Sequence, residues 1–295
     1  MTTTARHPII RYHGGKFRLA PWIIGHFPPH RIYTEAFGGA AGVLLQKPRS
    51  HGEVYNDLDG DVVTLFRVLR NPITRDLLVE RLGLTPYARD EFAAAYEPTT
   101  DPVETARRLV VRAQMGFGSA GATKGRTGFR LDTLRNGCNA QHLWATLPDH
   151  LLAVAKRLQG VLIENRDAML VLLDHDTPET LHYVDPPYVH STRQMAGKYY
   201  RHEMTDADHG RLLEVLRGLT GMVVLSGYAT DLYDRNLAGW EQRRTVAHCA
   251  SLRGSGAREE TLWLNPAAAQ AQAQAGLFGR WLLPPFKQKN RARQE

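Results

Sequence analysis

Residues 181–188 read LHYVDPPY, an apolar run that leads directly into an acid, two prolines and an aromatic residue. A short apolar run bounded by a turn is typical of a buried strand in a parallel sheet. Asp185 then stands at the carboxyl end of that strand, the edge at which open α/β sheets bind their ligands. This stretch therefore predicts the fold class and the edge of the sheet that carries the chemistry.

The rest of the chain repeats the pattern of short strands and helices. Two amphipathic segments, Asp59–Leu69 and Asp206–Leu219, predict helices that end at turn residues. This alternation favours an α/β fold with a doubly wound, Rossmann-like sheet. Four more apolar runs predict parallel strands, at Arg31–Thr34, Glu53–Tyr55, Val161–Ile163 and Met222–Ser226.

The tetrapeptide Asp185-Pro186-Pro187-Tyr188 suits the activation of an aromatic amine. The lone pair of such an amine is delocalised into its ring, so the amine needs hydrogen-bond acceptors aimed at its N–H bonds. The Asp185 carboxylate and the Pro186 carbonyl supply two acceptors, and the fixed φ of the two prolines helps to hold them in place. Tyr188 can stack on a base extruded from a duplex. An Asp-Pro turn with a surface tyrosine is the alternative interpretation.

A second group of motifs predicts a cofactor site at neighbouring strands. Residues 35–43, EAFGGAAGV, follow a predicted strand and form a turn of small residues that lets the backbone approach a ligand. The next predicted strand leads into Asn56-Asp57, where an acid commonly binds ribose hydroxyls. Residues 11–16, RYHGGK, form a flexible turn with an aromatic ring and a cation. Tight helix–strand packing also produces Gly-Ala runs, and the RYHGGK turn alone is compatible with a structural role.

A long polar segment separates the two halves of this pattern. Thr85–Arg112 reads as helices, and residues 115–139, MGFGSAGATKGRTGFRLDTLRNGCN, show little periodicity. Loops of this length inside a compact domain are commonly functional or disordered. We interpret residues 113–139 as a substrate-recognition insertion, with a solvated polar loop as the alternative. Its candidate DNA-binding residues are Lys124, Arg126, Arg130 and Arg135 for phosphates, and Gln114, Asn136 and Asn139 for base edges.

Composition favours a polyanionic partner. Lys and Arg outnumber Asp and Glu by 37 to 30 in 295 residues, which gives a net charge of +7 and a pI of about 9.5. Two distant cysteines and 13 histidines without ligand spacing predict neither a disulfide framework nor a metal site. The N-terminus lacks an apolar signal region, and no apolar run reaches the roughly 18 to 20 residues of a membrane span. We therefore expect a cytoplasmic protein.

The order of the motifs resembles the Dam-like, alpha-order D12 class of N6-adenine DNA methyltransferases, and phage-type adenine methylases in particular. The resemblance rests on Gly-Gly-Lys, Glu-Ala-Phe-Gly-Gly, Asn-Asp, the insertion and Asp-Pro-Pro-Tyr, and it extends over roughly Ile9–Pro266. It includes residues 164–167 (ENRD), 225–228 (LSGY) and 261–266 (TLWLNP). It implies S-adenosylmethionine as methyl donor without a metal, double-stranded DNA as partner, and a flipped-out adenine as target. For the oligomeric state we expect a monomer or a weak dimer.

The resemblance also assigns roles to single residues. Tyr12 would pack near the cofactor adenine with Lys16 beside the cofactor, and Asp57 would bind the ribose. Asp185 would contact the amino-group region of the cofactor as well as the target amine. Phe37 and Gly39 would line the methionine side. The implied sets are Tyr12, Gly15, Lys16, Glu35, Phe37, Gly39, Asp57, Asp167 and Asp185 for the cofactor, and Asp185, Pro186, Pro187 and Tyr188 for catalysis.

Two positions depart from the family pattern. Ala41 stands where the turn often has Gly, and Tyr12 stands where many members have Trp. The first departure would crowd the cofactor slightly, and neither removes a charged group.

The expected organisation is a catalytic domain interrupted by the insertion. Residues 1–70 and 151–266 form the two parts of the catalytic domain, 71–150 a mainly helical target-recognition insertion, and 267–295 a low-complexity spacer with a mobile basic tail. Two other function classes stay open at this stage. One is methylation of another planar amine or amide, in RNA, at cytosine N4 or on protein glutamine. The other is a DNA-binding protein of the same fold without turnover.

Overall fold

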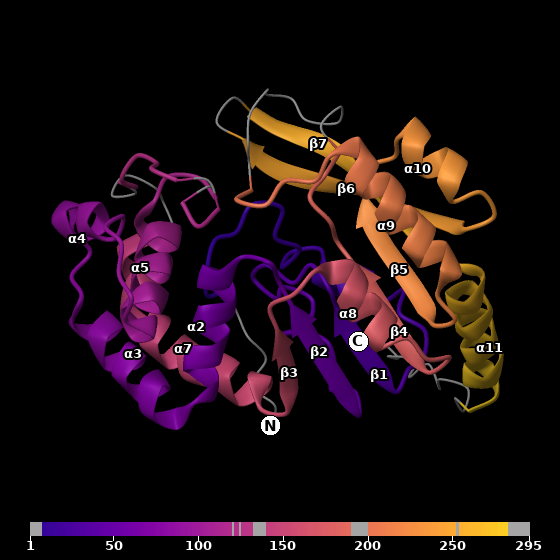
Figure 1. Cartoon of the computed structure of the whole chain (residues 1–295), viewed down its shortest axis with the longest axis horizontal. Helices are drawn as coiled ribbons and strands as arrows, with labels where there is room; N and C mark the ends of the chain where they lie inside the picture. Colours follow the sequence, from indigo (N-terminus) through magenta and orange to yellow (C-terminus); the bar gives the residue numbers. More distant parts are fainter. Residues whose placement is uncertain are drawn as a thin grey trace, which may run out of the picture.

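The fold is built on one mixed sheet of seven strands (Figure 1). The computed structural model describes residues 8–119, 121–123, 125–131, 140–189, 200–251 and 254–282. Strands β1 to β5 are parallel, in the order β3-β2-β1-β4-β5-β7-β6, and β7 is antiparallel to both of its neighbours. The strands are β1 (Ile32–Glu35), β2 (Gly52–Asn56), β3 (Val161–Glu164), β4 (Thr180–Val184), β5 (Met222–Gly227), β6 (Glu241–Ser251) and β7 (Gly254–Leu264).

The five strands predicted from apolar runs are confirmed, each within one residue of its predicted bounds. These runs form strands because both faces of the sheet are covered. On β5, Met222 and Val224 belong to one hydrophobic core, whereas Val223 and Leu225 belong to the other. Strands that are apolar on both faces require packing partners on both sides, which is the arrangement of a doubly wound sheet.

The strand order brings two functional motifs together. The chain moves outward from β1 to β2 and β3 and then returns to the other side of β1 as β4. In the register of this pair, Glu35 lies opposite Tyr183. The carboxyl ends of β1 and β4 therefore meet where the strand order reverses, and α/β sheets bind ligands at this point.

The helices begin at well-defined caps. Asp59, Asn71, Asp101 and Thr205 each accept a backbone N–H at the start of a helix, and Thr205 does so in a capping box. Within the described ranges, no helix is long and apolar enough to cross a membrane. The helices are α1 (Ala20–Ile24), α2 (Gly60–Arg70), α3 (Pro72–Leu84), α4 (Arg89–Ala94), α5 (Pro102–Met115), α6 (Ala140–Ala145), α7 (Leu147–Leu158), α8 (Ala168–Asp174), α9 (Asp206–Gly218), α10 (Asp231–Asn236) and α11 (Pro266–Leu282).

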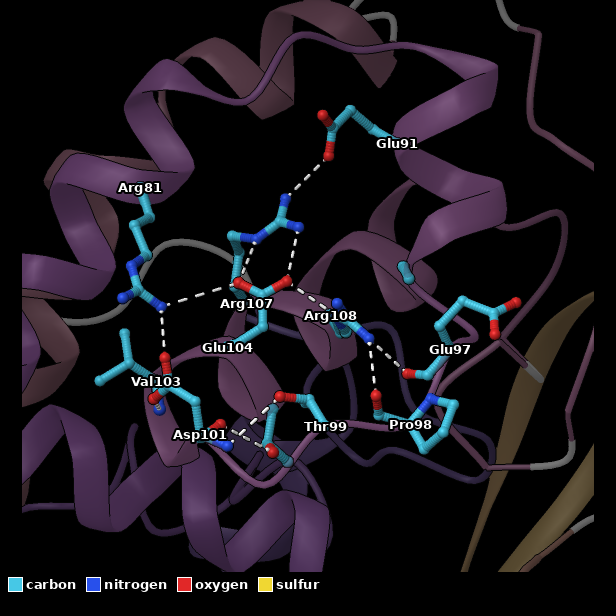
Figure 2. A network of polar contacts seen from close by, with 12 residues as sticks. Arg81, Glu91, Glu97, Pro98, Thr99, Asp101, Val103, Glu104, Arg107 and Arg108 are labelled. Atoms are coloured by element: carbon cyan, nitrogen blue, oxygen red, sulfur yellow. Dashed lines mark hydrogen bonds and ion pairs between the residues drawn. The ribbon is translucent and has the colours of Figure 1, made fainter.

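Helices α3, α4, α5 and α7 form a lobe beside the sheet (Figure 1). A polar network connects three of them (Figure 2): Arg107 of α5 pairs with Glu91 of α4 and with Glu104, and Arg81 of α3 lies 3.7 Å from Glu104. Arg108 also pairs with Glu104, at 2.7 Å. These ion pairs link α3, α4 and α5 to one another.

This lobe corresponds to most of the insertion expected at residues 71–150, and its described part is mainly helical as predicted. Helix α7 begins at Leu147 and continues through the expected boundary at residue 150. It packs against α3 and α2 as one element, so the helical lobe includes part of the segment expected to begin the second half of the catalytic domain.

The segment after residue 266, expected to be a low-complexity spacer, is helical as far as residue 282, and the tail expected to be mobile, residues 283–295, lies outside the described residues. Residues 267–282 continue α11, and Ala268 is fully buried while Ala267 and Ala271 pack against the core. Asn265 starts the helix because its Oδ1 accepts the N–H of Ala268 at 2.9 Å. Alanine and glutamine are strong helix formers, and a buried alanine face turns a low-complexity composition into an ordered helix.

Strands β6 and β7 were not predicted. The sequence of β6, EQRRTVAHCAS, lacks the apolar run that marks the parallel strands. It becomes a strand because it pairs with β7 over its whole length, and β7 in turn pairs with β5.

Candidate active site

A cavity opens at the carboxyl ends of β1, β2 and β4. It encloses about 1260 Å³ when the space that opens to solvent is included. The structure brings all nine predicted cofactor residues to its wall, and their individual roles toward a cofactor stay predictions. These residues are Tyr12, Gly15, Lys16, Glu35, Phe37, Gly39, Asp57, Asp167 and Asp185.

The small-residue turn after β1 requires glycine for steric reasons. A Cβ on Gly38 would lie 2.1 Å from the Tyr55 ring, and Gly39 has a φ of +47°. The ring of Tyr12 closes over this turn, because a Cβ on Gly39 would lie 2.9 Å from it. Ala41, the departure from the family pattern, is a non-glycine residue with a φ of 54° and is fully buried. The turn is therefore tightly packed on both sides.

Backbone N–H groups hold two predicted acids at the rim of the cavity. Asp57 accepts the N–H of Gly39 at 2.7 Å through Oδ2 and that of Asp59 at 2.8 Å through Oδ1. Burial raises the pKa of Asp57 to about 6. Asp167 caps α8 by accepting the N–H of Met169 at 2.8 Å. Carboxylates fixed in this way can accept further hydrogen bonds from a ligand inside the cavity.

Glu35 lies deeper, at the end of β1. Its Oε2 accepts the Tyr33 hydroxyl at 2.7 Å and the N–H of Leu44 at 2.8 Å. Burial raises the pKa of Glu35 to about 8. Burial therefore favours the protonated form of this carboxylic acid.

Residues 200–204 close one side of the cavity and were missed in the sequence. Arg201 bridges Asp59 and Asp61, at 2.9 Å from each, and so ties this segment to the start of α2. The Tyr200 ring lies 5.4 Å from that of His13. The sequence around Arg201 does not indicate that it pairs with these acids, because they lie about 140 residues earlier in the chain.

Lys16 forms an ion pair and hydrogen bonds with the catalytic motif. Its Nζ lies 2.7 and 3.0 Å from the two Asp185 oxygens and donates to the Tyr188 hydroxyl at 2.6 Å. The side chain is only 5% exposed. Burial alone lowers the pKa of Lys16, but the neighbouring carboxylates of Asp185 and Glu260 raise it well above its usual value. The lysine predicted to lie beside the cofactor does line the cavity, but its charge is directed at Asp185.

Three more residues complete the surroundings of Asp185 and Tyr188. Ser226 of β5 donates to Asp185 Oδ1 at 2.9 Å. The Tyr188 hydroxyl donates to the Glu260 carboxylate of β7 at 3.2 Å. The centroids of the Tyr188 and Tyr228 rings are 4.3 Å apart, with the rings tilted by 33°. The sequence motif LSGY included Ser226 and Tyr228, whereas Glu260 was missed. A charged residue next to the apolar run TLWL was the available signal, because a buried acid in a strand requires a partner.

Comparison with known families agrees with this arrangement. The sequence model of the D12 class N6 adenine-specific DNA methyltransferases matches residues 12–246, which is most of the chain. The chain belongs to this family. The resemblance inferred from the motifs is thereby confirmed, and so are the Rossmann-like α/β fold and the activity, adenine methylation of DNA. Membership in this class of methyltransferase also favours DNA adenine over the other acceptors that the sequence left open.

Other comparisons add little about this methyltransferase. The solved structure of precorrin 8W decarboxylase, the product of gene MT0146 of Methanobacterium thermoautotrophicum, is 11% identical, with 84% of this chain and 89% of that chain covered. Its TM-score is 0.33, so this likeness carries no argument. No curated protein matches the chain significantly.

Three of the seven predicted DNA-binding residues, Gln114, Arg126 and Arg130, lie in the part of the chain that the structure describes. The Gln114 amide donates to the Ile9 carbonyl at 2.8 Å, which gives it a structural partner. Arg126 is 71% exposed and lies 3.5 Å from Glu97, and the Arg130 N–H donates to the Met115 carbonyl. Lys124, Arg135, Asn136 and Asn139 lie outside the described residues. Their role in DNA binding stays a prediction.

Among the side chains that the structure describes, no group of three or more His, Cys, Asp or Glu residues is arranged to hold a metal ion.

Proposed function

We propose that this methyltransferase moves the methyl group of S-adenosylmethionine to the N6 amine of an adenine flipped out of double-stranded DNA, with Asp185 as the principal acceptor for that amine. The observation that carries the proposal is the place of Asp185. Its carboxylate lies in the wall of the same cavity as the small-residue turn, Asp57 and Asp167. One carboxylate can thus face both the methyl donor and the amine.

The residues of the cavity fit S-adenosylmethionine. The Gly38-Gly39 turn allows close approach of a ligand to the backbone, and Tyr12 supplies an aromatic ring beside it. Asp57 and Asp167 offer acceptors for ribose hydroxyls and an adenine amino group. When bound, the cofactor supplies a methyl group activated by its sulfonium. Phe37 and Gly39 would line its methionine side.

The contacts of Asp185 indicate which oxygen meets the amine. Oδ1 accepts from Lys16 at 2.7 Å and from Ser226 at 2.9 Å, whereas Oδ2 accepts from Lys16 at the longer distance of 3.0 Å. Oδ2 therefore keeps more capacity for the target N–H, and the Pro186 carbonyl would accept the second one. Two acceptors localise the amine lone pair toward the methyl group.

The proposal also assigns the recognition of the target sequence and the stacking of the flipped base. The helical lobe and residues 113–139 would recognise the target sequence, and the ring of Tyr188 would stack on the flipped base. Stacking on the base requires that Tyr228 leave room beside Tyr188, since the two rings are 4.3 Å apart. We place the reaction in the cytoplasm, without a metal and with the enzyme as a monomer or weak dimer.

Replacement of Asp185 tests the proposal. We expect Asp185→Ala to abolish methyl transfer while the protein stays folded and binds DNA, because it removes a positioned acceptor rather than core packing. Asp185→Asn should also lose most activity, since its amide can present an N–H toward the amine. Wild type and variants are expressed in a methylation-free host, and modified adenines are mapped by long-read sequencing. Retention of most of the wild-type rate by Asp185→Ala would refute the assignment.

A further inference from the structure

Glu260 of β7 is a buried carboxylate beside the catalytic motif. The side chain is 2% exposed, accepts the Tyr188 hydroxyl and lies 3.6 Å from the Lys16 ammonium. It reaches this position because β7 pairs with β5, whose Ser226 also contacts Asp185. Burial of a charged carboxylate is costly unless it is paired.

Around Lys16, carboxylates outnumber ammonium groups. Lys16 lies between the carboxylates of Asp185 and Glu260, at 2.7 Å from the first and 3.6 Å from the second. With both acids ionised, one positive and two negative charges give these three side chains a net charge of −1. Burial and the charge of Asp185 raise the pKa of Glu260, and Lys16 opposes this shift.

A net negative charge at this place can assist methyl transfer. As the amine attacks, positive charge moves from the sulfonium to the amine nitrogen next to Asp185. A fixed negative charge close to that nitrogen stabilises the transition state. If Lys16 were paired with Asp185 alone, the ammonium would cancel most of the field of that carboxylate at the amine.

We propose that Glu260 is a positioning residue for methyl transfer, which shares the charge of Lys16 and orients the Tyr188 hydroxyl, so that Asp185 keeps its charge and its direction toward the amine. This inference rests on the proposed role of Asp185. Glu260 acts through Lys16 and Tyr188, and its effect should appear in the rate of the chemical step. Cofactor affinity should change little, because Glu260 is not among the residues that line the cavity.

Two substitutions separate charge from shape. Glu260→Gln keeps the volume and an acceptor oxygen for Tyr188 but removes the charge, whereas Glu260→Asp keeps the charge and shortens the side chain. If charge matters, kcat should fall by about 10- to 100-fold in the Gln variant and less in the Asp variant. This loss is smaller than the roughly 100- to 1000-fold loss that follows removal of a direct contact to the reacting group, because Glu260 acts through Lys16 and Tyr188. If Glu260 only fills space, the Gln variant should be the more active one.

The matched control is Glu259→Gln. Glu259 is the preceding residue of β7, but its side chain is 53% exposed and pairs with Arg244. This variant makes the same chemical change one residue away and should keep the wild-type kcat. Single-turnover methylation, KM for S-adenosylmethionine and the melting temperature are measured for all three variants and for wild type.

The outcomes are distinct. A lower kcat in Glu260→Gln with KM within about twofold, and a higher kcat in Glu260→Asp than in Glu260→Gln, support the proposal. A wild-type kcat in Glu260→Gln, the opposite order of the two variants, or loss of the fold in the Gln variant overturns it. Full activity of Asp185→Ala, or an inactive wild type, would instead refute the proposed function.

Discussion

Asp57 and Glu35 are two carboxyl groups that line the cavity, Glu35 buried and Asp57 partly exposed, and each is held by backbone or hydroxyl donors. Their burial shifts both pKa values upward, to about 6 for Asp57 and about 8 for Glu35. Burial therefore favours the neutral form more strongly at Glu35 than at Asp57. The ionised form of Asp57 is suited to accept from ribose hydroxyls, whereas Glu35 is suited to a structural contact.

Binding of S-adenosylmethionine should depend on pH through Asp57. Hydroxyl donors bind a carboxylate more strongly than a carboxylic acid. We expect the affinity to be constant well above pH 6 and to decrease as the pH falls through 6, by at most about tenfold per pH unit. Calorimetric titrations across this range compare wild type with Asp57→Asn, which should bind more weakly near pH 7 and lack the pH step. The same step in the variant would place the titrating group elsewhere.

Without bound cofactor, the free energy of unfolding should depend on pH through the ionisation of Glu35. Its pKa is about 8 in the folded state and 4.5 ordinarily, so the folded protein holds this proton more tightly than the unfolded chain. The contribution to stability is then fully present below pH 4.5 and is lost as pH rises to about 8. Glu35→Gln keeps the acceptor oxygen and cannot ionise. We expect it to melt above wild type at alkaline pH and close to wild type below pH 4.5; a variant that melts lower at alkaline pH would contradict this account.

At the scale of single elements, the turn after β1 is the most constrained part of the cavity. Its N–H groups are satisfied by the Asn56 carbonyl and the Asp57 carboxylate, and the Tyr55 hydroxyl donates to the Gly39 carbonyl at 2.7 Å. The turn and the end of β2 thus form one unit. A change in the turn should therefore also displace the acid predicted to bind ribose.

Gly38→Ala should disrupt this unit. The new Cβ would lie 2.1 Å from the buried ring of Tyr55, so either the ring or the turn must move. We expect weaker cofactor binding together with a loss of stability of about 1 to 3 kcal/mol, typical of overpacking. The control is Gly60→Ala at the start of α2, where a Cβ meets nothing within 4 Å and a helical alanine is favoured. Equal melting temperatures for Gly38→Ala and wild type would show that the turn has more room than its geometry indicates.

At the scale of the whole molecule, the basic excess should appear as a salt-dependent affinity for DNA. The chain carries a net charge of +7, yet many arginines of the helical lobe are paired with acids, as Arg107 is with Glu91 and Glu104. Arg126 is 71% exposed, and its partner Glu97 is 64% exposed, so this pair is weak and can be exchanged for a phosphate. The segment from residue 124 to 135 is thus a reasonable place to seek phosphate contacts.

Neutralising Lys124, Arg126, Arg130 and Arg135 should weaken DNA binding equally on target and scrambled duplexes. The slope of log affinity against log salt should fall by roughly 0.9 for each phosphate that is no longer neutralised, while cofactor affinity stays the same. If one cation reads guanine, the preference should instead relax at one base position, at a cost of about 1 to 3 kcal/mol. Arg235→Gln, an 80% exposed arginine of α10, is the control for loss of charge alone. Unchanged affinity, slope and preference would mean that this segment is only a solvated connection.

The sequence by itself determined the parallel part of the sheet, the position of Asp185 at its edge and nine of the residues that line the cavity. These features have local signals: apolar runs for β1 to β5, glycines in a tight turn, and acids directly after strands. Each depends on neighbours within a few residues, and the α/β topology then brings all strand ends to one edge.

Only the tertiary structure decided the partners of those residues. Lys16 and Asp185 are separated by 169 positions, and Tyr188 and Glu260 by 72. Neither contact is marked by a sequence periodicity. Glu260 reaches Tyr188 because β7 enters the sheet beside β5, whereas Lys16 reaches Asp185 from the segment before α1. Likewise, β6 is a strand because of its partner, and α11 is ordered because Ala268 finds a core to pack against. Pairing and burial between distant segments depend on the assembled fold, whereas strand and turn propensities are local.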